Sequence, residues 1–472
     1  MQEKAMTVTQ KETVFFRIEA WMGRLLEGNQ AGREKNTIAV LDGVRALAIL
    51  MVIVFHINRM TGDNLWDWRG NPLASSVSTA GGTGVTLFFV LSGFLLFMPF
   101  AKSLLFKKPW PLVRVYYMRR ILRIWPGYYV SLFLLIFFLH PEYLQPDHRI
   151  DLVLFLTFFM DSARRTFRQL NGPYWTLATE WQFYMLLPLL ALAIAWLVMR
   201  VPREKRLQAV IWCLLGVIGC GLLVRWFGLY YLDHPGPTWI PPLLFRGIMF
   251  LFFGITGKYT EDFAVGMLIS ACYIYAQQAG DESRFVQRWR QISPWLWRAG
   301  IVILVFSAMW HFNAGEPAWP FLNGLMPVFS WLSEMVLAIG YGACIAAILY
   351  GPAGLQRPFA WNPLRWIGLI SYSLYIWHLP LLIVFATYIL PLFHIANHFL
   401  TYLLFWTWAL LVIFPFATLF YLMIERPFMR LGDRWRKGIE RRHKEKLKAR
   451  ELAKARAMDV ALPASREEGV SV

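Results

Sequence analysis

Cysteine is scarce in this sequence, with only four among 472 residues. None of the four stands in a Cys-x-x-Cys or metal-ligand spacing, which argues against a redox motif or a zinc site. We therefore expect no metal and interpret these cysteines as reduced packing residues in or beside apolar stretches; they are Cys213, Cys220, Cys272 and Cys344.

Acidic residues are also few, at 29 against 47 lysines and arginines, which gives a formal net charge of +18. A basic chain invites a nucleic-acid partner, but these basic residues gather between and after hydrophobic stretches. The positive-inside rule and attraction to anionic lipid account for that distribution. We therefore predict no nucleic-acid partner.

Polar sequence is too sparse for a soluble domain, since 57% of the residues are hydrophobic and the mean hydropathy is +0.44. The chain is long enough for about ten helices that cross a lipid bilayer. We predict an all-α, polytopic membrane protein. Its expected spans lie near residues 38–57, 82–101, 126–140, 174–199, 207–230, 260–278, 299–314, 327–350, 366–391 and 399–424. Two shorter apolar stretches, 151–160 and 243–256, are expected to be re-entrant or interfacial.

Three regions follow from this pattern. Residues 1–36 are polar, so we expect no cleavable signal peptide, and residues 14–26 alternate apolar and charged faces like an interfacial helix. Residues 37–430 form the membrane domain, and residues 431–472 form a charged, partly disordered tail. With ten spans, both termini and the most basic loops face the cytoplasm.

Two ionisable residues lie inside the first span, Arg45 and His56, with only apolar residues between them. Eleven helical steps make three turns plus about 20°, so both side chains share one face, about 16 Å apart along the axis. Ionisable groups at membrane depth usually mark a function. A desolvated imidazole stays neutral, as a general base requires. Asp42, on the same face, is a candidate partner for Arg45.

Small and basic residues mark the next two spans. Ser92 and Gly93 suit close helix packing, with the Ser92 hydroxyl bonded to a backbone carbonyl or lining a ligand channel. Arg120 and Arg123 share a helix face at the membrane surface. They either anchor the topology or form a fork for phosphates, which planar guanidinium donors suit.

A carboxylate follows in the fourth span, where Pro173 precedes a helix that contains Glu180 two turns later. An acid at this depth pairs with a cation, takes up a proton or acts in catalysis. Glu180 is either a structural ion-pair partner or the group that orients His56 and stabilises its charged form.

Two late segments contain further polar groups. His378 in the ninth span is as consistent with an interfacial position as with catalysis. Glu425 and Arg426 precede Pro427, which predicts a structural ion pair and the end of the last spanning helix.

In order, these segments resemble the acyltransferase-3 family of integral-membrane acyltransferases, over roughly residues 37–430. Six motifs carry the resemblance. They are Leu-Asp-Gly-Val-Arg45-x10-His56, Phe-Phe-Val-Leu-Ser92-Gly93-Phe94, Arg120-x-x-Arg123-Ile-x-Pro126, Trp175-Thr-Leu-x-x-Glu180-x-Gln-Phe-Tyr184, Ser371-Tyr-Ser-Leu-Tyr375-Ile-Trp-His378 and Glu425-Arg426-Pro427-Phe428. Thr176 and Trp181 stand where the family often has serine and a second glutamate.

The resemblance implies helices around a central acyl-donor channel, in a bacterial plasma membrane. It implies an O-acyltransferase that moves an acyl group, often acetyl, from cytoplasmic acyl-CoA to a hydroxyl of a cell-envelope or exported carbohydrate or glycolipid. His56 corresponds to the catalytic base, and Arg45, Arg120 and Arg123 to donor-handling arginines. With Glu180 as its partner and Ser92 in the channel, His56 would take the acceptor proton. The alternative is a proton-coupled transporter that uses the same His56–Glu180 pair.

Overall fold

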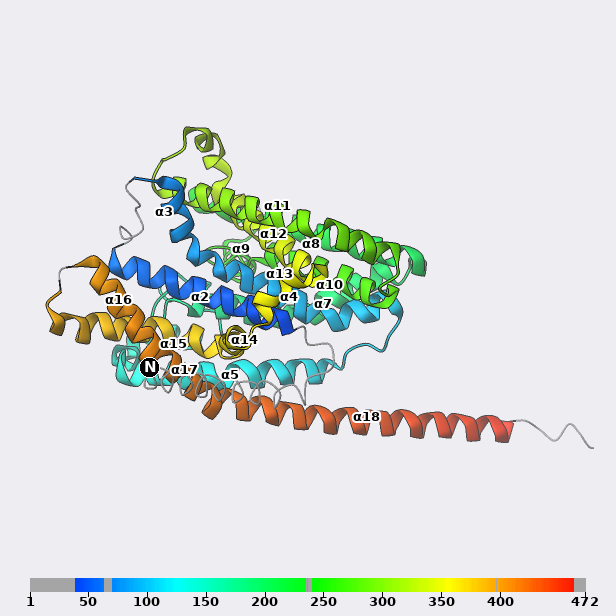
Figure 1. Cartoon of the computed structure of the whole chain (residues 1–472). Coiled ribbons are helices and arrows are strands. Elements are labelled where there is room, and N and C mark those ends of the chain that lie inside the picture. Colours follow the sequence, from blue (N-terminus) through cyan, green and yellow to red (C-terminus); the bar gives the residue numbers. More distant parts are fainter. Residues whose placement is uncertain (1–38, 63–69, 235, 237–239, 396, 462–472) are drawn as a thin grey trace, which may run out of the picture.

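The computed structural model describes residues 39–62, 70–234, 236, 240–395 and 397–461, and every regular element in these residues is helical. The long helices run side by side in one bundle, and α18 continues alone past it (Figure 1). The longer helices are α2 (Ala39–Thr61), α4 (Gly84–Phe106), α5 (Val113–Phe138), α7 (Tyr174–Val198), α8 (Arg206–Asp233), α10 (Thr260–Ala279), α11 (Arg284–Gly315), α12 (Phe329–Tyr350), α15 (Ser371–Val384) and α18 (Arg426–Ala461). The shorter helices are α3 (Pro72–Thr79), α6 (Arg149–Leu156), α9 (Pro242–Phe252), α13 (Ala353–Ala360), α14 (Asn362–Leu369), α16 (His398–Trp408) and α17 (Phe414–Phe420).

The all-α membrane architecture predicted from the sequence is confirmed. In the described ranges, nine helical stretches are long and apolar enough to cross a membrane. The helix α10 adds a tenth long segment at the predicted position, and it packs between α4, α8 and α12 although Glu261 and Asp262 lie in its first turn. The apolar stretches 151–160 and 243–256 form only the short helices α6 and α9.

Small residues bring α4 and α10 into backbone contact. A Cβ atom at Gly93 would lie 2.0 Å from the carbonyl oxygen of Phe263, and one at Gly266 would lie 2.0 Å from that of Val90. No side chain fits at either position, so the packing role expected for Gly93 is confirmed. This contact fixes α4, which contributes Ser92 to the candidate site.

The end of the chain corrects one prediction. Pro427 does not end a helix, because α18 begins at Arg426 and continues to Ala461. The π turn η10 (Tyr421–Glu425) lies directly before it. A proline ring clashes with the carbonyl four residues earlier, and the wider π turn relieves that clash. The prediction of an ion pair between Glu425 and Arg426 is also wrong, because Glu425 accepts a hydrogen bond from Ser373 on α15 instead.

Two further π turns also end two residues before a proline. The turn η7 (Phe385–Ile389) precedes Pro391, and η9 (Ala409–Ile413) precedes Pro415. The segments α16, η9, α17, η10 and α18 therefore follow one another as a continuous helical run. Of the predicted terminal regions, residues 1–36 and 462–472 lie outside the described residues, and the intervening tail is helical to Ala461.

Candidate functional site

One cavity in the bundle is lined by five of the six side chains singled out from the sequence. Arg45 reaches it from α2, and Ser92 from α4. Arg120 and Arg123 line it from α5, and Glu180 from α7. Residues from four helices thus converge on one space, as a channel for a single ligand requires.

The arginines at this cavity are suited to an anionic ligand. Arg120 lies over the Tyr184 ring at 5.8 Å, and Arg123 donates to the Met429 sulfur at 3.4 Å. Within the described part of the chain, neither forms an ion pair with a carboxylate, and the buried Nε of Arg120 has no hydrogen-bond acceptor. Arg45 has the expected partner, with its Nη1 3.9 Å from Oδ1 of Asp42. Partly buried guanidinium groups such as those of Arg120 and Arg123 favour phosphate oxygens as ligands.

Glu180 has different partners from those expected. Its Oε1 accepts a hydrogen bond of 2.5 Å from Ser92 and a second from the Tyr184 hydroxyl, one turn further along α7. The His56 ring is not among the contacts of Glu180 in the described residues. The two nearby hydroxyls satisfy this carboxylate locally, in the wall of the cavity.

The group beside His56 is His378. Nδ1 of His56 lies 2.9 Å from the Val52 carbonyl, and Nδ1 of His378 lies 2.9 Å from the Leu374 carbonyl. Because a carbonyl oxygen only accepts, each Nδ1 carries a hydrogen. Nε2 of His378 is therefore a lone-pair acceptor, 3.4 Å from Nδ1 of His56. Nε2 of His56 then has a free lone pair as well, which is the form of a general base.

Tyr375 separates the cavity from this histidine pair. Its ring lines the cavity beside Phe88, with 5.9 Å between their ring centroids, and its hydroxyl is 2.5 Å from Oγ1 of Thr176. The centroid of the Tyr375 ring is also 5.9 Å from that of the His378 ring. His56 itself does not line the cavity. The Tyr375 ring therefore lies next to both the arginine-lined cavity and the histidine pair.

Comparison with known proteins shows the family to which the chain belongs. The sequence pattern of a family described as an acyltransferase domain matches residues 38–423, which is most of the chain. The chain belongs to the acyltransferase-3 family. Five of the six motifs quoted above fall within that match, and each of the five contributes a residue to the cavity or to the histidine pair. The sixth motif begins at Glu425, just past the end of the match.

Several named relatives of this acyltransferase-3 chain are bacterial. A peptidoglycan O-acetyltransferase of Listeria monocytogenes is 27% identical over 365 residues, which cover 72% of this chain and 49% of the relative. A Bacillus subtilis protein, named provisionally as a peptidoglycan O-acetyltransferase, is 26% identical over 84% of this chain and 55% of its own length. The chain therefore spans about half the length of these curated relatives. No solved structure matches it.

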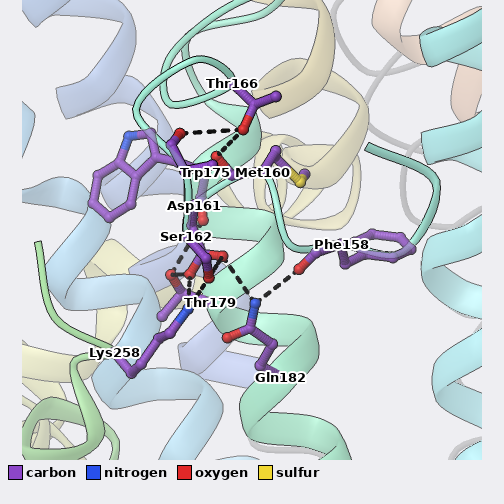
Figure 2. Close-up of polar contacts among 10 residues, drawn as sticks. Phe158, Met160, Asp161, Ser162, Thr166, Trp175, Thr179, Gln182 and Lys258 are labelled. Atoms are coloured by element: carbon purple, nitrogen blue, oxygen red, sulfur yellow. Dashed lines mark hydrogen bonds and ion pairs between the residues drawn. The ribbon is translucent and has the colours of Figure 1, made fainter. Parts of the chain in front are cut away.

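A buried ionic network supports the loop between α6 and α7, beside this site (Figure 2). Nζ of Lys258 lies 2.6 Å from Oδ2 of Asp161 and 2.8 Å from Oγ of Ser162. Gln182 on α7 donates to Oδ1 of Asp161 at 2.9 Å and to the Phe158 carbonyl at 2.8 Å. Burial lowers the pKa of Lys258 below its ordinary value, although the charge of Asp161 opposes this. The network fixes the loop to α7 and to the start of α10.

Sequence reasoning missed this network and left the role of His378 open. Asp161 and Lys258 are 97 positions apart, and neither belongs to a recognisable motif. His378 had a signal, since an imidazole in an apolar span needs a partner. The identity of that partner depends on how α2 and α15 pack, which no periodicity reveals.

Proposed function

We propose that the protein is a membrane-embedded O-acyltransferase that transfers an acyl group, acetyl in the first instance, from acyl-CoA to a carbohydrate hydroxyl. The observation that carries this proposal is the single cavity that joins three arginines to the neighbourhood of the His56–His378 pair. The names of the relatives make cell-envelope glycan, and peptidoglycan in particular, the acceptor class to test first.

The donor enters at the basic end of the cavity. Arg120, Arg123 and Arg45 hold the CoA phosphates, and the orphaned Nε of Arg120 supplies one of the donors. This end faces the cytoplasm, where acyl-CoA is made, and both termini lie on the same side. The pantetheine arm follows the face of α2 between Arg45 and His56, a distance of about 16 Å. Orientation along this track is a large part of what the protein contributes to the rate.

His56 acts as the general base in the transfer itself. Its Nε2 takes the proton of the acceptor hydroxyl while the hydroxyl oxygen attacks the thioester carbonyl. The new ester C–O bond forms as the C–S bond breaks. The CoA thiolate then takes the proton from Nε2, so that no proton is gained or lost overall.

His378 and Glu180 act as positioning residues in this scheme. His378 accepts from Nδ1 of His56, so the positive charge that develops on His56 faces a lone pair. Glu180 holds Ser92 and Tyr184 in the cavity wall, and Tyr184 in turn lies under Arg120. For the thioester to reach His56, the Tyr375 ring must move away from its bond with Thr176.

A proton-coupled transporter is the less favoured alternative. Such a relay needs His56 and Glu180 as a direct pair, and each has other partners in the described residues. The purified protein, incubated with acetyl-CoA labelled in the acetyl group and with peptidoglycan glycan strands, should yield labelled, base-labile ester on the glycan. His56→Ala should reduce this transfer about 10²–10⁴-fold. Wild-type protein that leaves the glycan unlabelled, or a His56→Ala variant at full rate, would overturn the proposal.

A further inference from the structure

The outer end of the histidine pair has a positively charged surface to which neither the sequence motifs nor the donor cavity assigns a role. It consists of Arg59, one turn after His56 on α2, and Arg168, in the loop between α6 and α7. Both side chains are exposed, and the charges of both act on the His56 ring. The charge of Arg168 also acts on Tyr375. Arg59 is three residues from His56 on α2, and the loop with Arg168 is bonded to α15 two residues before His378, so both arginines lie near the histidine pair.

Arg168 is held in place by its neighbours. Its guanidinium lies over the Phe167 ring at 5.2 Å and over the Trp175 ring at 5.8 Å. Stacking on two rings fixes the plane of the guanidinium while its edge stays available for hydrogen bonds. Arg59 is similarly placed over the Phe55 ring, at 5.8 Å.

The loop that carries Arg168 is fixed at both ends. Its start is tied to α7 and α10 through the Asp161–Lys258 network (Figure 2). Near its end, Asn171 donates to the Ile376 carbonyl at 2.9 Å, two residues before His378. Between these ties, Arg168 adopts a φ of 58°, an uncommon conformation for a residue other than glycine. Such strain persists only where the surrounding structure imposes it.

Neither cation is neutralised within the described part of the chain, since no carboxylate there pairs with Arg59 or Arg168. The neighbouring Arg165 differs, because it forms an ion pair with Asp151. Two guanidinium groups that have no carboxylate partner among the described residues suit a ligand that brings its own negative charge.

We propose that Arg168 and Arg59 form an anion-binding acceptor subsite, which holds a carboxylate or phosphate of the carbohydrate while His56 deprotonates its hydroxyl. This inference rests on the proposed transferase function. The anion has two chemical sources: a carboxylate on the glycan itself, or the diphosphate of a lipid-linked sugar.

The test compares three acceptors with the purified full-length protein and labelled acetyl-CoA. The first is a peptide-free tetrasaccharide of N-acetylglucosamine and N-acetylmuramic acid, which carries free carboxylates. The second is the same tetrasaccharide with its carboxylates converted to methylamides. The third is the corresponding disaccharide linked to a polyprenyl diphosphate, with its own carboxylate converted to a methylamide so that the diphosphate is the anion it presents. Arg168→Asn is the informative variant because asparagine tolerates positive φ, and Arg164→Asn removes an equal charge from an exposed position in the same loop.

Arg168→Asn should raise the acceptor KM about tenfold for the anionic acceptors. The KM of the methylamide acceptor and of acetyl-CoA should stay within about twofold, and Arg164→Asn should leave all these KM values unchanged. A response limited to the tetrasaccharide assigns the anion as a carboxylate, and one limited to the lipid-linked sugar assigns it as a phosphate. Equal effects on charged and neutral acceptors, or none, would overturn the subsite while leaving the transferase intact. If the wild-type protein labels none of the three, the proposed function itself fails.

Discussion

Nε2 of His378 lies 3.4 Å from Nδ1 of His56, and each ring also bonds through Nδ1 to a backbone carbonyl one turn earlier on its own helix. Two helices distant in sequence, α2 and α15, thus place one imidazole as the acceptor for the other. The relationship makes His378, and not the carboxylate expected from the sequence, the partner of the proposed base.

Replacement of His378 tests this relationship. His378→Ala should lower kcat about 10- to 100-fold with little change in the donor KM, because it removes support for a charge that develops only during transfer. His378→Gln keeps an acceptor oxygen and should recover part of the loss. His394→Ala, at an exposed position, is the control. A His378→Ala variant that expresses normally and transfers at the wild-type rate would exclude His378 from the mechanism.

A conservative substitution can show whether an arginine binds the acyl donor or only anchors the membrane topology. Arg120→Lys keeps the positive charge but loses the planar fork, so the KM for acetyl-CoA should rise about tenfold. Arg114→Lys, at an exposed position one helix turn and a half earlier on α5, should leave it unchanged. Initial rates over a range of acetyl-CoA concentrations measure the effect. Equal donor KM values for the two variants would remove Arg120 from the donor site.

Glu180 should affect the donor side of the reaction. Glu180→Gln keeps an oxygen that accepts from Ser92 and Tyr184 but removes the negative charge, so the expected change is a several-fold shift in the donor KM with kcat largely retained. The dependence of kcat on pH should match that of the wild type. A loss confined to kcat, with an altered pH profile, would return Glu180 to the role of His56 partner.

The Asp161–Lys258 pair should matter for stability. The Asp161 side chain is 3% exposed and that of Lys258 is 10% exposed, so Asp161→Ala leaves a largely buried, uncompensated ammonium and should cost about 3–5 kcal/mol of unfolding free energy. The double variant Asp161→Asn, Lys258→Met removes both charges and should be less destabilised than Asp161→Ala. Thermal unfolding in detergent shows which of the two variants is the more stable. A double variant less stable than the single one would show that the charges themselves stabilise the fold.

The lowered pKa of Lys258 also predicts a dependence on pH. Between this pKa and the ordinary lysine value of about 10.4, the unfolded chain binds more protons than the folded one, so the unfolding free energy rises with pH. The comparison that isolates Lys258 is wild type minus Lys258→Met, followed from neutral to alkaline pH. The difference should move in favour of the wild type as pH rises. A constant difference would mean that Lys258 titrates alike in both states.

The sequence sufficed for the membrane architecture and for the charged residues that meet at the cavity. Hydropathy alone located the spans, since apolar runs in lipid form helices. The shared face of Arg120 and Arg123 followed from helical periodicity. Contacts between helices could not be predicted in the same way. The sequence offered several possible partners for the Glu180 carboxylate, and in the structure it accepts hydrogen bonds from Ser92 and Tyr184. For the same reason, the sequence did not predict that His378 is the neighbour of His56, or that the Tyr375 ring lies beside His378.

Prolines in the C-terminal helices follow π turns, and each such turn inserts one residue beyond the regular repeat. One added residue rotates every later side chain by about 100° around the axis. The run that starts at His398 accordingly contacts α2 through α16 and contacts α5 through α18, after two such turns. One continuous helical run can therefore pack against two different helices, α2 and α5, with different faces. Deletion of one residue within either turn would swing everything downstream away from its partner without breaking the helix.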